Sequence, residues 1–464
     1  MNNTNKFIKT SIIYFIGNVL SKLMAFILIP IYTIYINTEI YGKYDLISSI
    51  ISLVVPLVFF QIWDGLFRFI YDYKTDKDKY KVVSNGLIVF IFGIIIYEIF
   101  FIIVSIFIKI PSPIFVNFYG ISYAAQYIFG TFSRTFKKNK LYMISGVVNT
   151  LVNLVSNIII IVLLKYRTVG GLFLSIVLGN FVQCIIISLN LKVFKNVKIK
   201  DFDFCLIKKI IKFSIPIAIS TISYWLLTGF TKVYISKNFG YSSNGIFAMA
   251  TKLASFIVVI VSVLQMAWHE SSFEVADNKY KKEYYEKGLN TFLAVLTVST
   301  TVIMMLLNFF FPYIVKGEYF NAKIYMPIVL IYTAVNSFSG FSSSQFLAEK
   351  DSKVPLYTTL FAAILNVILL FMFKRFDVLG ASISLLISFL LNTILRIIIL
   401  NKKYNINISK RLLLYSSVAF VVSCLIYYLC NSIINLVCGL VLLIIIIIKY
   451  GKMFIVMFHK KIKN

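Results

Sequence analysis

Long apolar runs separated by short polar gaps constrain this chain more than any other feature of its sequence. The 464 residues are 59% hydrophobic and 17% aromatic, and only 14% are charged. A helix needs roughly 20 apolar residues to cross the hydrocarbon core of a bilayer, and the sequence offers about fourteen runs of that length. We therefore predict an all-α polytopic membrane protein with about fourteen transmembrane helices. The predicted spans are residues 9–36, 44–71, 82–108, 113–134, 141–164, 168–191, 210–236, 243–268, 286–311, 322–348, 354–374, 378–400, 411–430 and 432–449.

The gaps between these runs leave no room for a soluble catalytic domain, since the longest covers only residues 193–209. The first run is too long to be the apolar core of a cleavable signal peptide. The five cysteines show no metal-ligand spacing and lie mostly within apolar runs, so we interpret them as packing residues. We expect no catalytic residue, no metal ion and no cofactor.

The basic residues are sorted between alternate gaps. With the N-terminus placed inside, 32 Lys and Arg residues fall in cytoplasmic gaps and nine in outer gaps. Anionic lipid and the membrane potential hold cations in cytoplasmic loops, so this bias predicts that both termini are cytoplasmic. The formal net charge of +28 therefore reports topology and does not indicate binding to nucleic acid.

The chain shows signs of an internal duplication. Residues 8–12 resemble residues 211–215, and Gly42 matches Gly245 at the same offset of 203 residues. Each copy holds six predicted spans, so the copies start on the same side of the membrane and are parallel repeats. A central cavity and alternating access, by rocking of one bundle against the other, follow as a hypothesis. The predicted domains are an N-terminal six-helix bundle (1–200), a C-terminal six-helix bundle (201–404), and two extra transmembrane helices with a cytoplasmic tail (405–464).

Four predicted spans have a proline in their interior, where it removes a backbone hydrogen bond and favours a kink. These prolines are Pro30, Pro56, Pro216 and Pro327. A hinge at Pro30 or Pro56 and passive packing geometry both remain open.

Four short stretches carry a resemblance to a known family. They are residues 36–44, 65–73, 265–270 and 379–382. Together with the layout of six, six and two spans, they make the chain resemble polysaccharide-repeat flippases of the Wzx type. These belong to the multidrug/oligosaccharidyl-lipid/polysaccharide exporter superfamily, which includes MATE exporters and the lipid II flippases. The resemblance covers essentially the whole chain.

This resemblance implies a transporter in the bacterial cytoplasmic membrane. Its substrate would be an oligosaccharide repeat unit on a polyprenyl diphosphate, moved to the periplasmic leaflet for capsule, O-antigen or exopolysaccharide assembly. The implied partners are membrane lipids and this lipid-linked glycan, with a polysaccharide polymerase and glycosyltransferases as further candidates.

Five cations belong to neither the inner nor the outer set and lie within predicted spans, where an ionisable group costs several kcal/mol and usually faces the interior of the bundle. Lys22 lies about 13 residues into the first run and Lys252 about nine residues into the eighth, too deep to reach an interface easily. An ammonium group supplies a compact positive charge, so these two are the strongest candidates for binding a diphosphate or acidic sugar. The alternative is a structural pair with a carboxylate such as Asp45, Asp64 or Glu98.

The other three buried cations lie nearer the ends of their spans. Arg68 could pair with Asp64 one turn earlier or grip phosphate oxygens in a bidentate manner. Lys232 could contact substrate or extend its amine to the outer interface. Arg396 is expected to act as a topological anchor. The predicted substrate-binding residues are therefore Lys22, Lys252, Arg68 and Lys232.

A second group of side chains could serve coupling or gating. These residues are Asp64, Glu98, His269 and Glu270. Glu98 lies near the middle of its span and could carry a coupling proton or sodium ion, or pair with a lysine. Trp225 and Trp268 suit either a helix-packing position or a sugar-stacking surface.

Two other functions compete with the flippase. A MATE-like cation-coupled drug antiporter needs a cavity dominated by carboxylates, whereas the deep charges here are mostly cationic. A polysaccharide polymerase or ligase would be expected to carry a long periplasmic loop with Arg or His clusters, and no predicted outer loop exceeds roughly 15 residues. The phosphate-loop motif of ATP-driven pumps does not occur either. We predict a transporter and not an enzyme.

Overall fold

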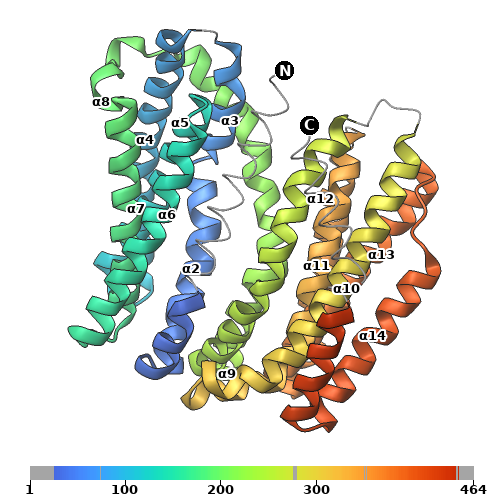
Figure 1. Ribbon diagram of the computed structural model, residues 1–464. Coiled ribbons are helices and arrows are strands. Elements are labelled where there is room, and N and C mark those ends of the chain that lie inside the picture. The colour runs from blue at the N-terminus through green and yellow to red at the C-terminus, as the bar shows by residue number, and fades with distance from the viewer. Residues whose placement is uncertain are drawn as a thin grey trace. The chain divides into compact units, whose positions relative to one another are not determined.

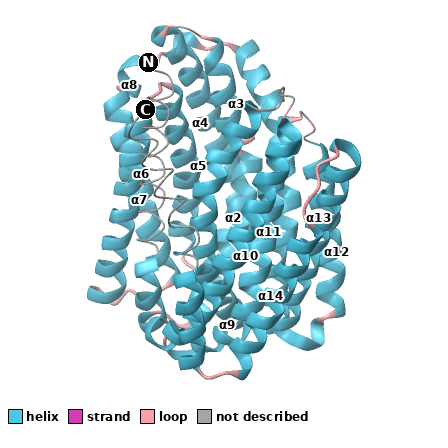
Figure 2. Cartoon of the chain, turned by 45° about the vertical axis from the view of Figure 1, so that its right-hand side comes forward, coloured by secondary structure: helices cyan, strands magenta, loops and turns pink. Residues whose placement is uncertain are grey.

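The computed structural model describes residue 24 and residues 26–73, 75–274, 280–349, 351, 353–445 and 448. Every regular element in these ranges is a helix (Figure 2). Ten of the described helices are long and apolar enough to cross a membrane, and shorter apolar helices cover Phe26–Tyr35 and Ser432–Ile445. The predicted all-α membrane fold is confirmed, and the number of fourteen spans stays a prediction.

The chain divides into two compact units, Met1–Ala248 and Met249–Asn464, and each is described by itself. The first unit contains α2 (Thr38–Val58), α3 (Ile62–Phe69), η1 (Ile70–Asp72), α4 (Asp76–Phe107), α5 (Pro113–Thr135), α6 (Asn139–Asn157), η2 (Ile158–Leu163), α7 (Val169–Leu191), α8 (Val193–Asn196), η3 (Ile199–Asp201) and the first part of α9 (Phe204–Glu274). The second contains the rest of α9, α10 (Lys281–Ile314), η4 (Gly317–Asn321), α11 (Ala322–Ala348), α12 (Lys353–Met372), η5 (Lys374–Phe376), α13 (Asp377–Tyr404) and α14 (Lys410–Leu429). The bundle boundaries predicted at residues 200 and 404 stay predictions.

Polar residues at the ends of the gaps set where several helices begin. Asn37 precedes α2 in an extended conformation, and its side chain accepts a hydrogen bond from the backbone N–H of Ile40 at 2.8 Å. Thr75 and Thr168 cap α4 and α7 in the same way. A side-chain oxygen at this position satisfies one of the N–H groups that the first helical turn leaves without a partner.

The predicted span at residues 44–71 is broken into two helices, α2 and α3. Phe60 and Gln61 at the break have φ angles of 53° and 47°, a left-handed conformation that is costly for residues with a Cβ atom. Pro56 has no N–H to donate within α2, and its carbonyl accepts a hydrogen bond from the Gln61 N–H at 2.7 Å. The kink expected at Pro56 is therefore a full interruption, which lies three to five residues beyond the proline.

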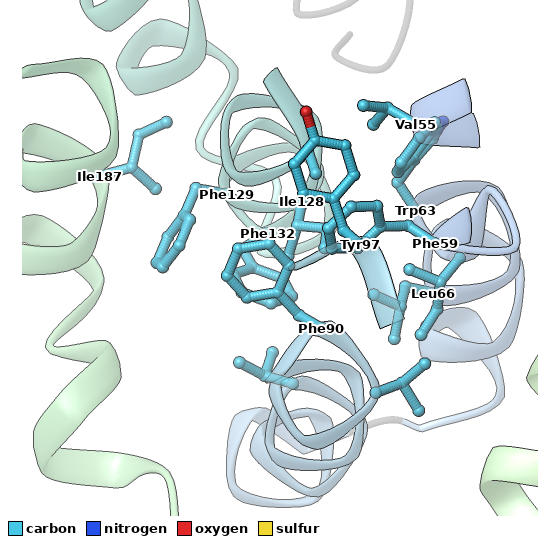
Figure 3. Close-up of a cluster of buried hydrophobic side chains, with 14 of the residues drawn as sticks. Val55, Phe59, Trp63, Leu66, Phe90, Tyr97, Ile128, Phe129, Phe132 and Ile187 are labelled. Carbon is cyan, nitrogen blue, oxygen red and sulfur yellow. The ribbon is translucent and has the colours of Figure 1, made fainter. Parts of the chain in front are cut away.

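An apolar cluster surrounds this break in the first unit (Figure 3). The Phe59 ring lies 5.6 Å from the Phe90 ring and 6.2 Å from the Tyr97 ring, measured between centroids. A Cβ atom on Gly93 of α4 would lie only 2.5 Å from the Phe59 ring, so the glycine leaves the space that this ring fills. The packing of Phe59 against α4 thus holds the interrupted helix in place.

Amide side chains join α5, α6 and α7, which run beside one another (Figure 1). Asn149 donates to Asn180 Oδ1 at 3.0 Å and to Gln183 Oε1 at 2.6 Å. Gln126 also donates to Gln183, and Asn180 donates to Ser122. Hydrogen bonds of this kind hold helices together in a bilayer, where lipid gives no hydrophobic drive for association. The network therefore stabilises the first unit.

The predicted spans at residues 210–236 and 243–268 both lie in α9. At Gly240 the backbone leaves the helical region, with φ 89° and ψ 164°. Glycine adopts this φ readily because it has no Cβ atom. The 71 residues of α9 are far more than the roughly 20 that cross a bilayer, so the turn at Gly240 separates two crossings.

Arg396 is buried in the second unit and joins three of its helices. This corrects the expectation that it anchors the chain at the membrane surface. The residue is only 4% exposed. Its guanidinium uses all five N–H groups, donating to oxygens on α11 and α12. The acceptors are the Ser339 carbonyl, Ser343 Oγ, the Pro355 carbonyl, Thr358 Oγ1 and Thr359 Oγ1, at 2.6 to 3.2 Å. Arg396 therefore ties α11 and α12 to α13.

We predict that Arg396→Lys lowers the unfolding temperature of the purified protein and that Arg396→Leu lowers it further. Lysine has three donors in place of five, and a polar contact between membrane helices is worth about 0.6 kcal/mol on average. Arg411→Lys, at an exposed position at the start of α14, is the matched control. Equal unfolding temperatures for the Arg396 variants and the control would contradict a role of Arg396 in joining α11, α12 and α13.

Candidate functional site

One face of α2 lies against α9, and we call this the α2–α9 contact. Its α2 residues are Thr38, Gly42, Asp45 and Ser49, whose spacing of four, three and four places them on one side of a helix. Its α9 residues are Trp225, Lys232, Tyr241, Ser242, Asn244 and Gly245. All ten residues belong to the first compact unit.

Two glycines let the backbones of α2 and α9 meet. A Cβ atom on Gly42 would lie 1.8 Å from the carbonyl oxygen of Tyr241, and one on Gly245 would lie 2.0 Å from the carbonyl oxygen of Thr38. The approach is reciprocal, since Thr38 and Tyr241, like Gly42 and Gly245, are 203 residues apart. A two-fold relation between duplicated hairpins produces such a pattern. Any side chain at either glycine would force the helices apart.

Four polar contacts surround the glycines. Thr38 Oγ1 lies 2.5 Å from Ser242 Oγ, and Asn244 donates to the Gly42 carbonyl at 2.9 Å. Further along α2, the Trp225 indole N–H donates to the Ser49 carbonyl at 2.8 Å. This bond occupies the polar group of Trp225 and favours the packing interpretation of that residue.

The fourth contact is an ion pair between Lys232 and Asp45. Lys232 Nζ lies 2.8 Å from Asp45 Oδ1, and the two side chains are 22% and 17% exposed. Asn244 also donates to the other oxygen of Asp45, at 3.4 Å. Asp45, one of the three carboxylates considered as partners for the deep cations, is therefore bonded to Lys232. The charge of Lys232 is therefore balanced within the contact.

Arg68 pairs with Asp72 at 3.1 Å, one turn later, and not with Asp64 as the sequence suggested. Asp64 accepts a hydrogen bond from Gln61 Nε2 at 2.7 Å, at the break between α2 and α3. The interruption brings Gln61 next to Asp64 and leaves Arg68 in the last turn of α3, close to η1. The Arg68 side chain is 57% exposed, so its guanidinium is accessible from outside the bundle.

Glu98 lies half-buried on α4, where Asn117 of α5 donates to its Oε2 atom at 2.8 Å. The two side chains line a cavity of about 380 Å³ between α4 and α5. The bond that the structure describes for Glu98 is therefore to an amide and not to a lysine.

The remaining predicted residues are only partly covered by the structure. Lys22 lies outside the described residues, and the side chains of His269 and Glu270 do as well, although their backbone belongs to α9. Lys252 is half-buried on α9, in the second compact unit. Trp268 is buried and stacks on Phe341, with ring centroids 4.9 Å apart, which supports the packing interpretation.

The second unit contains an apolar groove of about 680 Å³ between α10, α11, α13 and α14. Aliphatic and aromatic side chains make nearly all of its surface, with Thr393, Ser416, Ser417 and Cys424 as its polar or weakly polar members. Among the described residues, no charged side chain lines this apolar groove. It is suited to a long hydrocarbon chain. No cluster of three or more metal-ligating side chains occurs among the described residues.

These features define a multi-pass helical membrane protein with an apolar groove. The chain belongs to the polysaccharide biosynthesis protein family, which matches it over residues 7–269, more than half of its length. A Haemophilus influenzae protein named after the Lsg locus is 22% identical over 349 residues, which cover 71% of this chain and 82% of that protein. The resemblance to polysaccharide flippases and their superfamily is thereby confirmed.

Two solved structures have a similar fold. The lipid II flippase MurJ, in an inward closed conformation, superposes with a TM-score of 0.69 at 13% identity, covering 96% of this chain and all of MurJ. An outward-facing multidrug resistance MATE family transporter gives a TM-score of 0.60 at 15% identity, covering 90% of this chain and 95% of the transporter. At these identities the likeness shows a shared fold. Both are transporters, in agreement with the prediction that this chain is a transporter and not an enzyme.

Sequence reasoning found part of this site and missed part of it. The offset of 203 residues identified Gly42 and Gly245 as equivalent positions, but nothing in the sequence indicated that they touch. Asp45 was noted only as one of three carboxylates that could neutralise a deep cation. Its position one helical turn after Gly42, on the same face of α2, was a signal that could have placed it in the contact.

We predict that Lys232→Met impairs surface polysaccharide more than the double variant Lys232→Met/Asp45→Asn. Removing one partner leaves a poorly solvated charge, whereas replacing both removes that cost. Polysaccharide is measured on whole cells at matched protein levels, with Lys237→Met, an exposed position on α9, as the control. A double variant as defective as the single one would contradict a purely structural pair and support direct contact of Lys232 with substrate.

Proposed function

We propose that this protein moves a polyprenyl-diphosphate-linked oligosaccharide across the bacterial cytoplasmic membrane, from the inner to the outer leaflet. The product would feed the assembly of capsule, O-antigen or exopolysaccharide. Membership of the polysaccharide biosynthesis family supports the pathway. The fold shared with MurJ, whose name states that it flips lipid II, supports the type of transport.

The apolar groove of the second unit is the observation that carries this proposal. Its volume of about 680 Å³ falls within the range of roughly 300–1,000 Å³ that is usual for ligand sites. Lipid tails are as apolar as the groove, so a polyprenyl chain gains little hydrophobic free energy by entering it. The groove instead offers shape and van der Waals contact, which would keep the tail beside the protein while the head group crosses.

The α2–α9 contact is our candidate for a gate. In the predicted topology, residues 37–43 and 237–242 lie at the outer ends of their helices, so the contact would close the outer side. The contact joins α2 and α9 within the first compact unit. In the division predicted at residue 200, opening it would move the two bundles apart. A substrate that binds the open form more tightly would shift the population toward it. Alternating access follows from this arrangement as part of the proposal.

Positive charge for the diphosphate is proposed to come from Lys22 and Lys252, with Arg68 at the entrance. Their depth in the predicted spans supports this role for the two lysines, and the exposure of the guanidinium supports it for Arg68. Glu98 is the candidate to carry H⁺ or Na⁺, and Asp64, His269 and Glu270 are further candidates for coupling or gating. Glycosyltransferases that build the substrate and a polymerase that consumes it are the proposed partners.

Transport in proteoliposomes tests the proposal. The probe is a polyprenyl diphosphate oligosaccharide with a fluorescent sugar, whose outer-leaflet fraction is quenched by an impermeant reductant. Probe in the inner leaflet is protected from the reductant until it is flipped. We predict that the protein accelerates the loss of this protected fluorescence and that Val421→Trp, which fills the groove, slows the loss. The control is Val418→Trp on the same helix, because Val418 and Val421 are 51% and 59% exposed and only Val421 lines the groove.

The same assay separates the proposal from its alternatives. Lys252→Ala should slow transport of the diphosphate probe when it is compared with the wild type at equal amounts of folded protein. If wild-type protein leaves the probe in place but exports ethidium in exchange for a cation that moves down its gradient, the MATE-like antiporter is the better account. If the protein instead joins the oligosaccharides into longer chains, it is a membrane polymerase or ligase.

A further inference from the structure

A second elongated pocket, of about 740 Å³, lies in the first unit between α2, α4 and the segment that leads into α5. Tyr241 of α9 also lines it. We call it the α2–α4 pocket. It is separate from the apolar groove, which is built from helices of the other unit.

The body of the α2–α4 pocket is apolar and open to the membrane. Ile47, Ile50 and Val54 of α2 face Phe100 and Val104 of α4. Ile50 and Phe100 are exposed large hydrophobic residues on membrane-spanning helices. A side chain exposed at this position meets hydrocarbon, so the body of the pocket is accessible to an acyl chain from the bilayer.

One end of the α2–α4 pocket is positively charged. Lys43 and Lys109 both line it, and Ser112 turns the chain there into the N-terminus of α5. The first turn of a helix carries partial positive charge from N–H groups without helical partners. Among the described residues, no carboxylate lines this pocket. Glu39 outside it pairs with Lys43, which leaves the charge of Lys109 to be balanced.

We propose that the α2–α4 pocket binds an anionic glycerophospholipid from the bilayer, with the phosphate at Lys43 and Lys109 and an acyl chain between α2 and α4. The pairing of a cationic end with an apolar body matches the two parts of such a lipid. A soluble phosphate would use only the charged end. In the predicted topology the charged end lies at the outer surface, where the head group of an outer-leaflet lipid is found.

The bound lipid stabilises the α2–α9 contact. Lys43 directly follows Gly42, and its Nζ atom lies 5.1 Å from the centre of the Tyr241 ring. The carbonyl of the same tyrosine packs on Gly42. A lipid that touches both Lys43 and Tyr241 therefore binds the closed form of the contact more tightly than the open form. Such a lipid raises the population of the closed form.

Binding of labelled phosphatidylglycerol to the purified full chain in detergent tests this proposal, with labelled phosphatidylcholine of the same chains as the comparison. Wild-type protein is expected to prefer phosphatidylglycerol, and Lys43→Gln/Lys109→Gln should weaken its affinity roughly thirtyfold. Lys316→Gln/Lys374→Gln removes the same charge from two other predicted outer positions and should leave the affinity unchanged. Val104→Trp fills the apolar body while keeping both lysines, and it should also weaken binding.

Three results would overturn the proposal. They are equal affinity of the wild type for the two lipids, an equal loss in the Lys316/Lys374 control, and unchanged binding in Val104→Trp. Displacement of phosphatidylglycerol by polyprenyl diphosphate at a lower concentration would assign the pocket to the transported lipid instead. None of these results depends on transport activity, so the proposal can fail while the proposed function stands.

Discussion

The close approach of two backbones at Gly42 and Gly245 is the constraint on which the α2–α9 contact depends. With carbonyl oxygens where two Cβ atoms would have to be, the helices can meet only if both positions are glycine. Close packing of small residues is the usual route to helix association in a bilayer, because lipid offers no hydrophobic drive. The Thr38–Ser242 and Asn244–Gly42 bonds and the Asp45–Lys232 pair all follow from that approach.

Such a contact is suited to opening and closing. Short polar bonds and two glycines take part in it. The approach of the two glycines is reciprocal, so each hairpin contributes one of them. The break between α2 and α3 lies on the same helix, three to five residues after Pro56, and it divides α2 from the end that carries Asp64 and Arg68. Helices interrupted at membrane depth are common in transporters, where backbone irregularity is tolerated only if protein surrounds it.

Much of the fold could be predicted from hydropathy, because a membrane-spanning helix must be a long apolar run. The start of α4 lay six residues earlier than predicted, since polar residues capped by Thr75 extend the helix beyond its apolar part. The break at Phe60 and Gln61 could not be predicted, because it depends on the fit of Phe59 against Gly93 of another helix. Pro56 predicts a kink in this span, but it determines neither that the helix is fully interrupted nor where the interruption lies.

The roles of the charged residues could likewise be predicted only in part. Their sorting between gaps predicts the topology, whereas their partners depend on tertiary packing. Arg68 has an aspartate one turn away on either side, and only the break beside Gln61 determines that Asp72 is the partner. Asp45 and Lys232 are 187 residues apart, so their pairing follows only from the contact of α2 with α9.

The most direct measurement is a reversible cross-link across the α2–α9 contact in a variant without its native cysteines. Thr38→Cys/Ser242→Cys should form a disulfide on oxidation, because the two hydroxyl oxygens are 2.5 Å apart. Thr38→Cys/Ser243→Cys is the control, since Ser243 bonds to the Phe239 carbonyl instead. If the contact is a gate, flipping in proteoliposomes stops on cross-linking and returns on reduction. Full activity of the cross-linked protein would contradict the gate.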